Sequence, residues 1–221
     1  MASGWREAAL DALAVVLPVR CAGCGRADRA LCGGCRAALA PRPAIEHRTP
    51  GGLLVRAAHE YGGVVRRVLL AYKEDGRTVL ARELAVPLAA LLAPALLAPG
   101  PVPPGPGVVI AAVPSSAAAR RRRGFEPVPT LLRAAGYRSP RLLVVAPGPQ
   151  QKGLGLAERA RARSGAMRAR RPLAGIPVLL VDDVVTTGAS LDEAARAVRA
   201  AGGTVAGAVA LASTPRHADG R

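Results

Sequence analysis

Residues 178–190 contain the side chains of this sequence that are best suited to chemistry. Two adjacent carboxylates, Asp182 and Asp183, are followed by two valines and by a turn that reads Thr186-Thr187-Gly188-Ala189-Ser190. Carboxylates can accept hydrogen bonds from the vicinal hydroxyls of a sugar, directly or beside a Mg²⁺ ion. The turn can bind a phosphate group, because it offers hydroxyl donors and a glycine that lets the backbone approach closely. A ligand with a phosphate at one end and a ribose diol at the other fits both halves.

The flanking residues predict the elements that hold this segment in place. The apolar run 178–181 is typical of a strand that is buried on both faces of a parallel sheet, and residues 191–200 favour a helix that stops at Gly202-Gly203. Ser190 and Glu193 have the spacing of a capping box. The turn would lie at the carboxyl end of the strand, where open α/β sheets bind ligands and where the helix dipole favours a phosphate. The alternative, an ordinary buried strand and capped helix, explains neither the adjacent acids nor the hydroxyl-rich turn.

All the cysteines of the chain fall within one short segment, as two C-x2-C pairs formed by Cys21, Cys24, Cys32 and Cys35. Two such pairs, with glycines inside the turns, can bring four thiolates to one tetrahedral Zn²⁺ ion. Disulfides are the weaker explanation in a reducing cytosol, and a redox C-x2-C motif would not need a second pair. We therefore predict a structural zinc knuckle, because four thiolates leave no open position for catalysis.

The composition leaves the choice of partner open but argues against a membrane location. The 221 residues carry a formal net charge of +16, almost all of it from arginine, which permits a nucleic-acid partner and equally reflects the codon bias of a GC-rich genome. Residues 1–17 contain Glu7 and Asp11 within their apolar stretch, and therefore favour an amphipathic helix over a secretory signal. The apolar stretch 84–99 is short for a membrane span and contains three prolines. These features predict a cytoplasmic protein without membrane insertion.

The remaining sequence alternates candidate strands and helices, which is the pattern of a parallel α/β sheet. Besides the strand before Asp182, strands are predicted at residues 53–59, 108–114, 142–146 and 204–212. Helices are predicted over residues 60–73 and 84–99. A further helix is predicted to follow Phe125 and to end at about residue 135. The segment 150–171 is rich in arginine and is predicted to be mobile and to contain a helix.

The same patterns predict how the chain is divided. An N-terminal helix and the zinc-binding knuckle would occupy residues 1–40, and the proline-rich residues 41–50 would form a linker. The main domain would span residues 51–213 and include a surface loop over 99–107. Residues 214–221 would form a disordered tail.

The segment around Asp182 and Asp183 resembles the phosphoribosyl pyrophosphate (PRPP) signature of type I phosphoribosyltransferases. Further motifs follow in the order found in ComF-type competence proteins of that family: the cysteine pairs, Tyr61-Gly62-Gly63 leading to Tyr72-Lys73, Val113-Pro114 leading to Arg123-Gly124-Phe125, and Gln151 leading to Glu158-Arg159 and Gly165-Ala166. The resemblance covers about residues 20–212, although Glu126-Pro127 and Ala162 depart from the family pattern. It implies a parallel-sheet phosphoribosyltransferase-like domain with a small N-terminal four-cysteine zinc knuckle.

The resemblance also implies what the site residues do. PRPP, together with Mg²⁺, would bind to Asp182, Asp183, Val184, Thr186, Thr187, Gly188, Ala189 and Ser190. Asp182 and Asp183 would also be catalytic, because they would stabilise an oxocarbenium-like transition state while a nitrogen acceptor attacks and pyrophosphate leaves. Pro114, Ser115 and Ser116 are candidates for the loop that binds the pyrophosphate. No segment of the sequence identifies the acceptor.

Two other functions stay open at this point. The resemblance also permits a non-catalytic DNA-uptake factor that binds single-stranded DNA or a DNA-processing helicase, or a PRPP sensor without turnover. The arginine run 120–123 is interpreted first as a solvated or hinge segment, second as a contact to DNA or a partner, and third as a pyrophosphate ligand. Phe125 beside it either stacks on a base or anchors the next helix.

Overall fold

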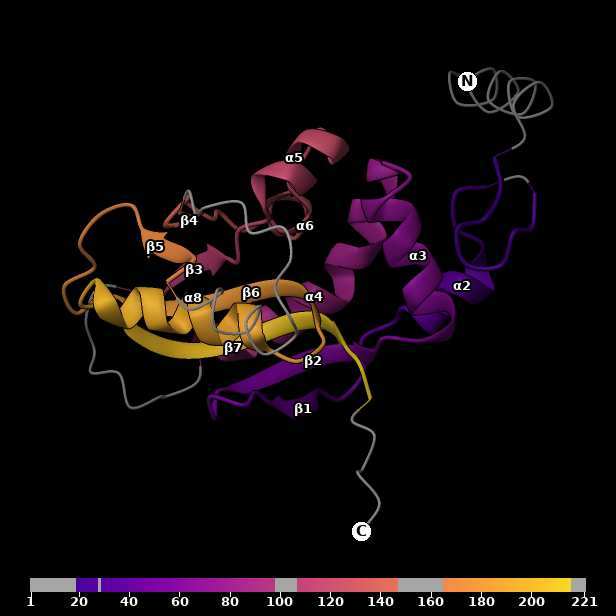
Figure 1. Ribbon diagram of the computed structural model, residues 1–221. Helices are drawn as coiled ribbons and strands as arrows, with labels where there is room; N and C mark the ends of the chain where they lie inside the picture. Colours follow the sequence, from indigo (N-terminus) through magenta and orange to yellow (C-terminus); the bar gives the residue numbers. More distant parts are fainter. Residues whose placement is uncertain (1–18, 28, 98–106, 147–164, 216–221) are drawn as a thin grey trace, which may run out of the picture.

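The computed structural model of the protein describes residues 19–27, 29–97, 107–146 and 165–215. Its centre is a five-stranded sheet in the order β1-β2-β7-β6-β3 (Figure 1). The strands are β1 (Ile45–Arg48), β2 (Leu54–Glu60), β3 (Val109–Ala112), β6 (Pro177–Val185) and β7 (Thr204–Ser213). Strands β2, β7, β6 and β3 are parallel, whereas β1 pairs antiparallel with β2 at one edge. The predicted parallel α/β architecture is therefore confirmed.

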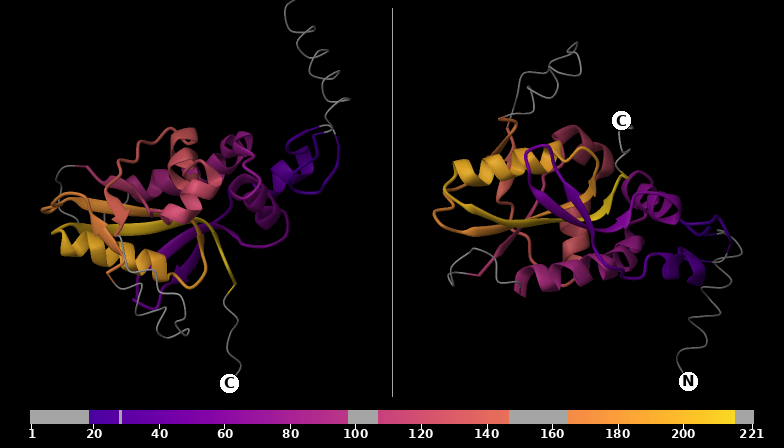
Figure 2. Two further views of the ribbon diagram at one scale, coloured as in Figure 1. Left: turned by 45° about the horizontal axis from the view of Figure 1, so that its top comes forward. Right: turned by 90° about the horizontal axis from the view of Figure 1, so that it is seen from below.

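Helices cover both faces of this sheet (Figure 2). One face carries α3 (Gly63–Lys73), α4 (Ala81–Leu97) and α6 (Pro127–Ala134), and the opposite face carries α8 (Ala189–Ala200). The shorter elements are α2 (Gly33–Ala38), the 3-10 turn η1 (Thr78–Leu80) and α5 (Ala117–Arg123). Strands β4 (Leu143–Val145) and β5 (Met167–Ala169) form a separate antiparallel pair that contacts α8.

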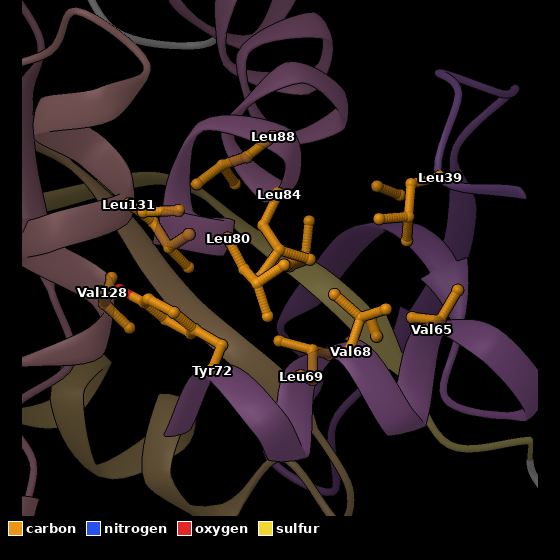
Figure 3. Packing of buried hydrophobic residues seen from close by; sticks show 14 of the residues in the cluster. Leu39, Val65, Val68, Leu69, Tyr72, Leu80, Leu84, Leu88, Val128 and Leu131 are labelled. Carbon is orange, nitrogen blue, oxygen red and sulfur yellow. The ribbon is translucent and has the colours of Figure 1, made fainter. Parts of the chain in front are cut away.

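The core on the α3 face extends from the sheet into the cysteine-containing segment. Tyr72 and several leucines of η1, α4 and α6 are fully buried there, and Leu39, which follows α2, lies beside α3 (Figure 3). Cys21, Cys32 and Cys35 belong to the same buried cluster. The cysteine segment is therefore packed into the main domain, although the sequence predicted a linker between the two.

The helix predicted over residues 84–99 is a core helix of this face. Residues Thr78–Leu96 are long and apolar enough to cross a membrane by length and composition alone. However, 44% of their most apolar window is buried inside the fold, and Leu84, Leu88 and Leu92 are completely buried. The segment thus forms the partly buried helix that its sequence predicted.

Two strands occur where the sequence predicted none. β1 lies in the proline-rich segment 41–50, where exposed Glu46 and Arg48 flank the buried His47, and its pairing with β2 makes it a strand. β5 lies in the segment 150–171, and β4 pairs with it instead of joining the parallel sheet. The helix and mobility predicted for residues 150–164 lie outside the described residues. The same holds for the predicted N-terminal helix, for residues 98–106 and for the tail beyond residue 215.

Candidate functional site

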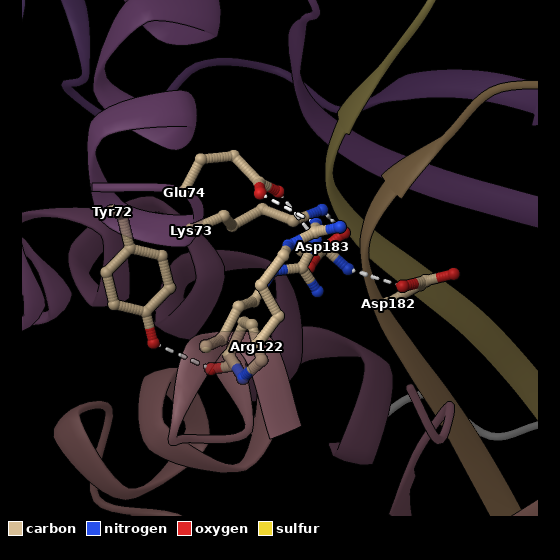
Figure 4. Close-up of polar contacts among 8 residues, drawn as sticks. Tyr72, Lys73, Glu74, Arg122, Asp182 and Asp183 are labelled. Carbon is tan, nitrogen blue, oxygen red and sulfur yellow. Dashed lines mark hydrogen bonds and ion pairs between the residues drawn. The ribbon is translucent and has the colours of Figure 1, made fainter. Parts of the chain in front are cut away.

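The sequence predicted that Asp182 and Asp183 follow the strand, but both residues lie within β6. The strand continues to Val185, and Asp182 is paired in register with Ala210 of β7. Because neighbouring residues of a strand point to opposite faces, the two carboxylates diverge. Asp183 points towards α3, whereas Asp182 points away from it and lines a hollow formed by the turn after β6 (Figure 4).

Asp183 forms an ion pair with a lysine of α3. Lys73, the last residue of that helix, places its Nζ atom 2.9 Å from Asp183 Oδ1. The side chains are only 20% and 11% exposed, so each charge depends on the other for compensation. The sequence marked Lys73 as part of a motif but gave no sign of this contact, because 110 residues separate the partners.

The arginine run is the C-terminal part of α5, and most of it is engaged in ion pairs. Arg122 and Arg123 donate to Glu74 at 2.8 Å and 2.6 Å, and Arg120 lies 3.7 Å from Glu126. Hydrogen bonding to Arg123, more than to Arg122, holds the pKa of Glu74 below its usual range. Among the described residues, Arg121 is the one arginine of the run without an ion pair. Arg120, Arg121 and Arg122 are exposed, as the interpretation as a solvated segment predicted, whereas Arg123 is half-buried and ties α5 to Glu74, the residue after α3.

Phe125 anchors the corner between α5 and α6. Its ring meets that of Tyr72 edge to face, with centroids 5.3 Å apart and an interplanar angle of 68°. The hydroxyl of Tyr72 donates to the carbonyl of Pro127 at 2.8 Å. Gly124, with a φ of 72°, ends α5 in the left-handed conformation and allows this turn. These contacts favour the anchoring interpretation of Phe125 over base stacking.

Asp182 lies in surroundings that disfavour its charged form. Burial, and secondly the neighbouring Asp183, raise the pKa of Asp182 to about 8. The backbone N–H of Asp183, which lies 2.8 Å from Asp182 Oδ1, and the charge of Lys73 oppose this rise. A cation or hydroxyl donor at this carboxylate would therefore relieve an unfavourable charge.

The turn after β6 forms a small hollow with the composition of a phosphate site. The hollow has a volume of about 60 Å³ and is lined by Asp182, Val184, Val185, Thr186, Thr187, Gly188, Ala189, Ser190 and Leu191. Gly188, with a φ of 80°, precedes the first residue of α8. Among the described residues, the backbone N–H groups of Thr187, Gly188 and Ser190 have no hydrogen-bond acceptor. Free N–H groups at the start of a helix are what a phosphate dianion needs.

A hairpin from the far edge of the sheet holds this turn in place. Thr49, between β1 and β2, donates its hydroxyl to Asp192 Oδ1 at 2.5 Å, and the N–H of Gly51 donates to Oδ2 at 2.9 Å. A Cβ atom on Gly188 would lie 2.4 Å from Thr49 Cγ2. Asp192 is thereby occupied by the hairpin and leaves the N–H groups of the turn free. No local pattern could predict this contact, because 143 residues separate Thr49 and Asp192.

The capping box predicted from Ser190 and Glu193 is not formed. Ser190 lies inside α8, and Gly188 is the residue that precedes the helix. Glu193 is only 7% exposed and accepts a hydrogen bond from the N–H of Met167 at 2.9 Å. It also pairs with Arg196 at 2.8 Å. Glu193 therefore joins α8 to β5, which explains why a three-residue strand without a sequence pattern is formed there.

The candidate pyrophosphate segment lies at the same sheet edge as the acid pair. Pro114, Ser115 and Ser116 follow β3, the neighbour of β6, and the N–H of Val113 donates to the carbonyl of Val181 at 2.8 Å. Ser116 caps α5 by accepting from the N–H of Ala119 at 3.1 Å. Ser115 lines a separate hollow of about 30 Å³ next to Glu126 and Arg141. The segment is thus near the acids, with the hydroxyl of Ser116 already used by the helix.

The four cysteines meet as the sequence predicted. Their Sγ atoms all lie within 4.8 Å of one another, and those of Cys24 and Cys32 are 3.7 Å apart. Four sulfurs about 2.3 Å from a central zinc ion would be about 3.8 Å apart. The N–H of Cys32 donates to Cys21 Sγ at 3.3 Å. A Cβ atom on Gly23 would lie 2.5 Å from Cys35 Sγ, so a glycine is needed here, and the donor set fits a tetrahedral zinc ion.

Arginines attach the knuckle to the helices beside it. Arg67 of α3 donates its Nε to the carbonyl of Gly23, and Arg77 donates to the carbonyl of Ala30 at 3.3 Å. Arg36 of α2 forms a bidentate ion pair with Glu83 of α4. Its Nη2 lies 2.7 Å from Oε1, and its Nε lies 2.9 Å from Oε2. Together with the shared buried cluster, these contacts fix the knuckle to α3, to the turn that follows it and to the start of α4.

A family model of the phosphoribosyl transferase domain matches residues 122–220. The matched part is somewhat less than half of the chain and includes α6, β6, the turn after it, α8 and β7. A comparison with curated proteins finds no match. The family match and the mostly parallel sheet indicate a phosphoribosyltransferase-type domain in the matched part of the chain.

Proposed function

We propose that the protein binds PRPP at residues 182–190 and transfers its phosphoribosyl group to a nitrogen acceptor. The observation that carries this proposal is the hollow after β6, which has the Asp182 carboxylate on one side and free backbone N–H groups on the other. The phosphate of PRPP would occupy the turn, with the hydroxyls of Thr186, Thr187 and Ser190 as further donors. The ribose diol would lie at Asp182.

The chemistry follows from this placement. The acceptor nitrogen forms a bond to the anomeric carbon of the ribose while the bond from that carbon to pyrophosphate breaks. Positive charge grows on the ribose, and Asp182 and Asp183 stabilise it electrostatically. When bound, Mg²⁺ supplies charge neutralisation for the departing pyrophosphate, and the carboxylates and the pyrophosphate itself would hold it. Lys73 orients Asp183 through their 2.9 Å contact.

The departing pyrophosphate would face the segment after β3. Pro114, Ser115 and Ser116 are the proposed loop, and the N–H groups of this segment suit it better than Ser116 Oγ, which caps α5. Among the arginines nearby, Arg122 and Arg123 are held by Glu74 and are proposed as a fixed positive wall of the site.

Calorimetric titration with PRPP and Mg²⁺ tests the binding step. Asp182→Asn should weaken PRPP binding about tenfold or more, because a charge-assisted hydrogen bond is lost. Glu46→Gln, which removes an exposed carboxylate from β1, is the matched control and should bind as the wild type does. Unchanged affinity in Asp182→Asn would refute the assignment of the site.

Transfer is tested separately, by measuring pyrophosphate release over a panel of nitrogenous bases and amines. Release with one acceptor class and not with the others would identify the substrate. PRPP binding without release for any acceptor would instead support a sensor or competence factor.

We also propose that Cys21, Cys24, Cys32 and Cys35 hold one structural Zn²⁺ ion. The convergence of the four Sγ atoms supports this assignment. Metal analysis of protein purified under reducing conditions should find about one zinc ion per chain. Protein without stoichiometric zinc would refute the proposal.

The finer identity that we propose is a ComF-type protein. It is supported by the way separate motifs of the resemblance meet, since Lys73 pairs with Asp183, Arg123 pairs with Glu74, and Phe125 packs on Tyr72. The alternative competence role, with single-stranded DNA or a helicase as partner, finds less support, because most of the arginine run is used within the fold. DNA binding that falls steeply with salt, and is lost in Arg121→Gln, would favour that alternative.

A further inference from the structure

A second hollow lies between β5 and the C-terminal half of α8, away from the turn after β6. Its volume is about 690 Å³, within the range of small-ligand sites, and it is open to solvent. Four arginines line it: Arg168, Arg170, Arg171 and Arg196. Ser190 and Ala200 are ten residues apart on α8, so the two hollows lie about 15 Å apart along the helix.

One of these arginines is fixed in position by the fold. Arg196 donates its Nε and Nη2 atoms to Glu193, each at 2.8 Å, and Nη2 also donates to the carbonyl of Met167 at 2.8 Å. Among the described residues, its remaining nitrogen, Nη1, has no acceptor. A guanidinium that is held at one side and free at the other is preorganised to bind an anion, because little side-chain entropy remains to be lost.

The other three arginines leave the hollow with an uncompensated positive charge. Arg168, Arg170 and Arg171 are exposed, and within the described residues none of them has an ion-pair partner. No carboxylate is among the residues that line the hollow, and the nearby Glu193 is already bound to Arg196 and Met167. Such a concentration of guanidinium groups is matched best by phosphate oxygens, which accept two parallel hydrogen bonds from each group.

Besides the arginines, called the rim below, the hollow is lined by small apolar residues, called the floor. Among them are Ala197, Ala200, Ala201 and Pro172, which carry no polar side-chain atoms. A flat ring can lie on such a surface, and arginine planes can stack on that ring. Inorganic phosphate alone would use the rim and leave the floor in water.

We propose that this hollow binds a nucleoside phosphate, with its phosphates on the arginines and its base against the alanine floor. The floor offers no donor or acceptor side chain to read the edge of a base, so the site would accept different bases. This binding does not depend on the phosphoribosyl transfer proposed above.

Calorimetric titration with ADP tests the proposal in three variants of the full chain. Arg168→Gln combined with Arg171→Gln should weaken the binding of ADP at least about tenfold, since charge-assisted contacts are removed. Arg199→Gln is the matched control, because Arg199 is exposed on α8 and does not line the hollow. Asp182→Asn combined with Asp183→Asn should leave this ADP binding intact and so separate it from the turn after β6.

Three results would overturn the proposal. ADP binding that is lost in the acid-pair variant and kept in the arginine variant would place the nucleotide at the turn after β6. Inorganic pyrophosphate that binds as tightly as ADP would show that the floor contributes nothing. A short single-stranded oligonucleotide that depends on Arg168 and Arg171, with no binding of ADP, would identify a nucleic-acid surface instead.

Discussion

The cysteine knuckle and the turn after β6 are both built from a few polar groups around a glycine, but they are assembled in opposite ways. The knuckle takes all its sulfur atoms from one segment, residues 21–35, and they converge on one point. The turn depends on partners from distant parts of the chain, because Thr49 fixes Asp192 across 143 residues and Lys73 fixes Asp183 across 110. A site whose residues are close in sequence can be predicted from their spacing. For a site whose residues come from distant parts of the chain, the sequence predicts only the residues that are contiguous.

The two regions also differ in what their polar groups lack. In the knuckle, four potential thiolates face one another, so the missing partner is a cation. At the turn, a carboxylate with a raised pKa stands beside free N–H groups, so the missing partner carries both hydroxyls and an anion. These differences agree with the proposals that the knuckle stabilises the fold and that the turn binds a ligand.

Loss of the knuckle should have the largest effect. Cys35→Ser should lower the free energy of unfolding by about 3 kcal/mol or more, because metal binding is coupled to folding and the cysteines share a buried cluster with α3 and α4. Thermal unfolding followed by circular dichroism measures the change. Gly34→Ala is the control, since a Cβ atom there would meet nothing within 4 Å. An unchanged unfolding transition would mean that the knuckle is independent of the main domain.

The second-largest effect on stability is expected from a substitution that crowds the turn after β6. Gly188→Ala should cost about 2 kcal/mol, because its φ of 80° strains an alanine and its Cβ atom would meet Thr49 Cγ2. Gly175→Ala is a matched control, with a φ of 69° but open space around the new atom, and should cost less. Adding Thr49→Ser removes the Cγ2 atom and should restore part of the loss in urea unfolding. No difference between the two glycine variants would contradict the close packing of the hairpin on the turn.

Breaking the buried ion pair should have a smaller effect. Lys73→Met leaves the carboxylate of Asp183 buried without its cation and should cost about 2 kcal/mol at most. Arg36→Gln removes an ion pair of similar length whose arginine is 59% exposed, and should cost less than about 1 kcal/mol. Urea unfolding of both variants measures the difference. Equal costs would show that Lys73 contributes no more than a surface charge.

The smallest expected effect is the pH dependence that Asp182 contributes. A carboxyl group whose pKa is raised on folding binds more protons in the native state, so it favours the fold at acid pH. Its contribution to stability should fall as the pH rises from about 4, the usual value, towards about 8. Asp182→Asn should remove this slope and stabilise the unliganded protein by about 1 kcal/mol at the upper end, a value reduced for partial exposure. Urea unfolding at several pH values checks this, and a slope that is the same in Asp182→Asn and wild type would contradict it.

The contiguous parts of both sites could be predicted from the sequence. The apolar run before Asp182, the glycine stop at Gly202 and the C-x2-C spacing have strong local patterns, and the structure places them as expected. β5 could not be predicted, because its three residues are held by β4 and by Glu193 and not by their own pattern. The predicted capping box does not form for the same reason. Glu193 is buried beside Met167 and accepts a hydrogen bond from its N–H instead of one from the start of α8.

The strand order has a consequence for how the protein is made. β2 has β7 as its parallel neighbour, and β7 leaves the ribosome after all the other strands of this sheet. Until β7 has emerged, β2 has an open edge, and Thr49 can meet Asp192 only after α8 has been synthesised. Contacts of such high sequence separation slow folding, because a long loop must close before they form. The turn that we propose to bind the phosphate can therefore reach its final arrangement only after β7 has been synthesised, so a product truncated before β7 would not carry a finished site.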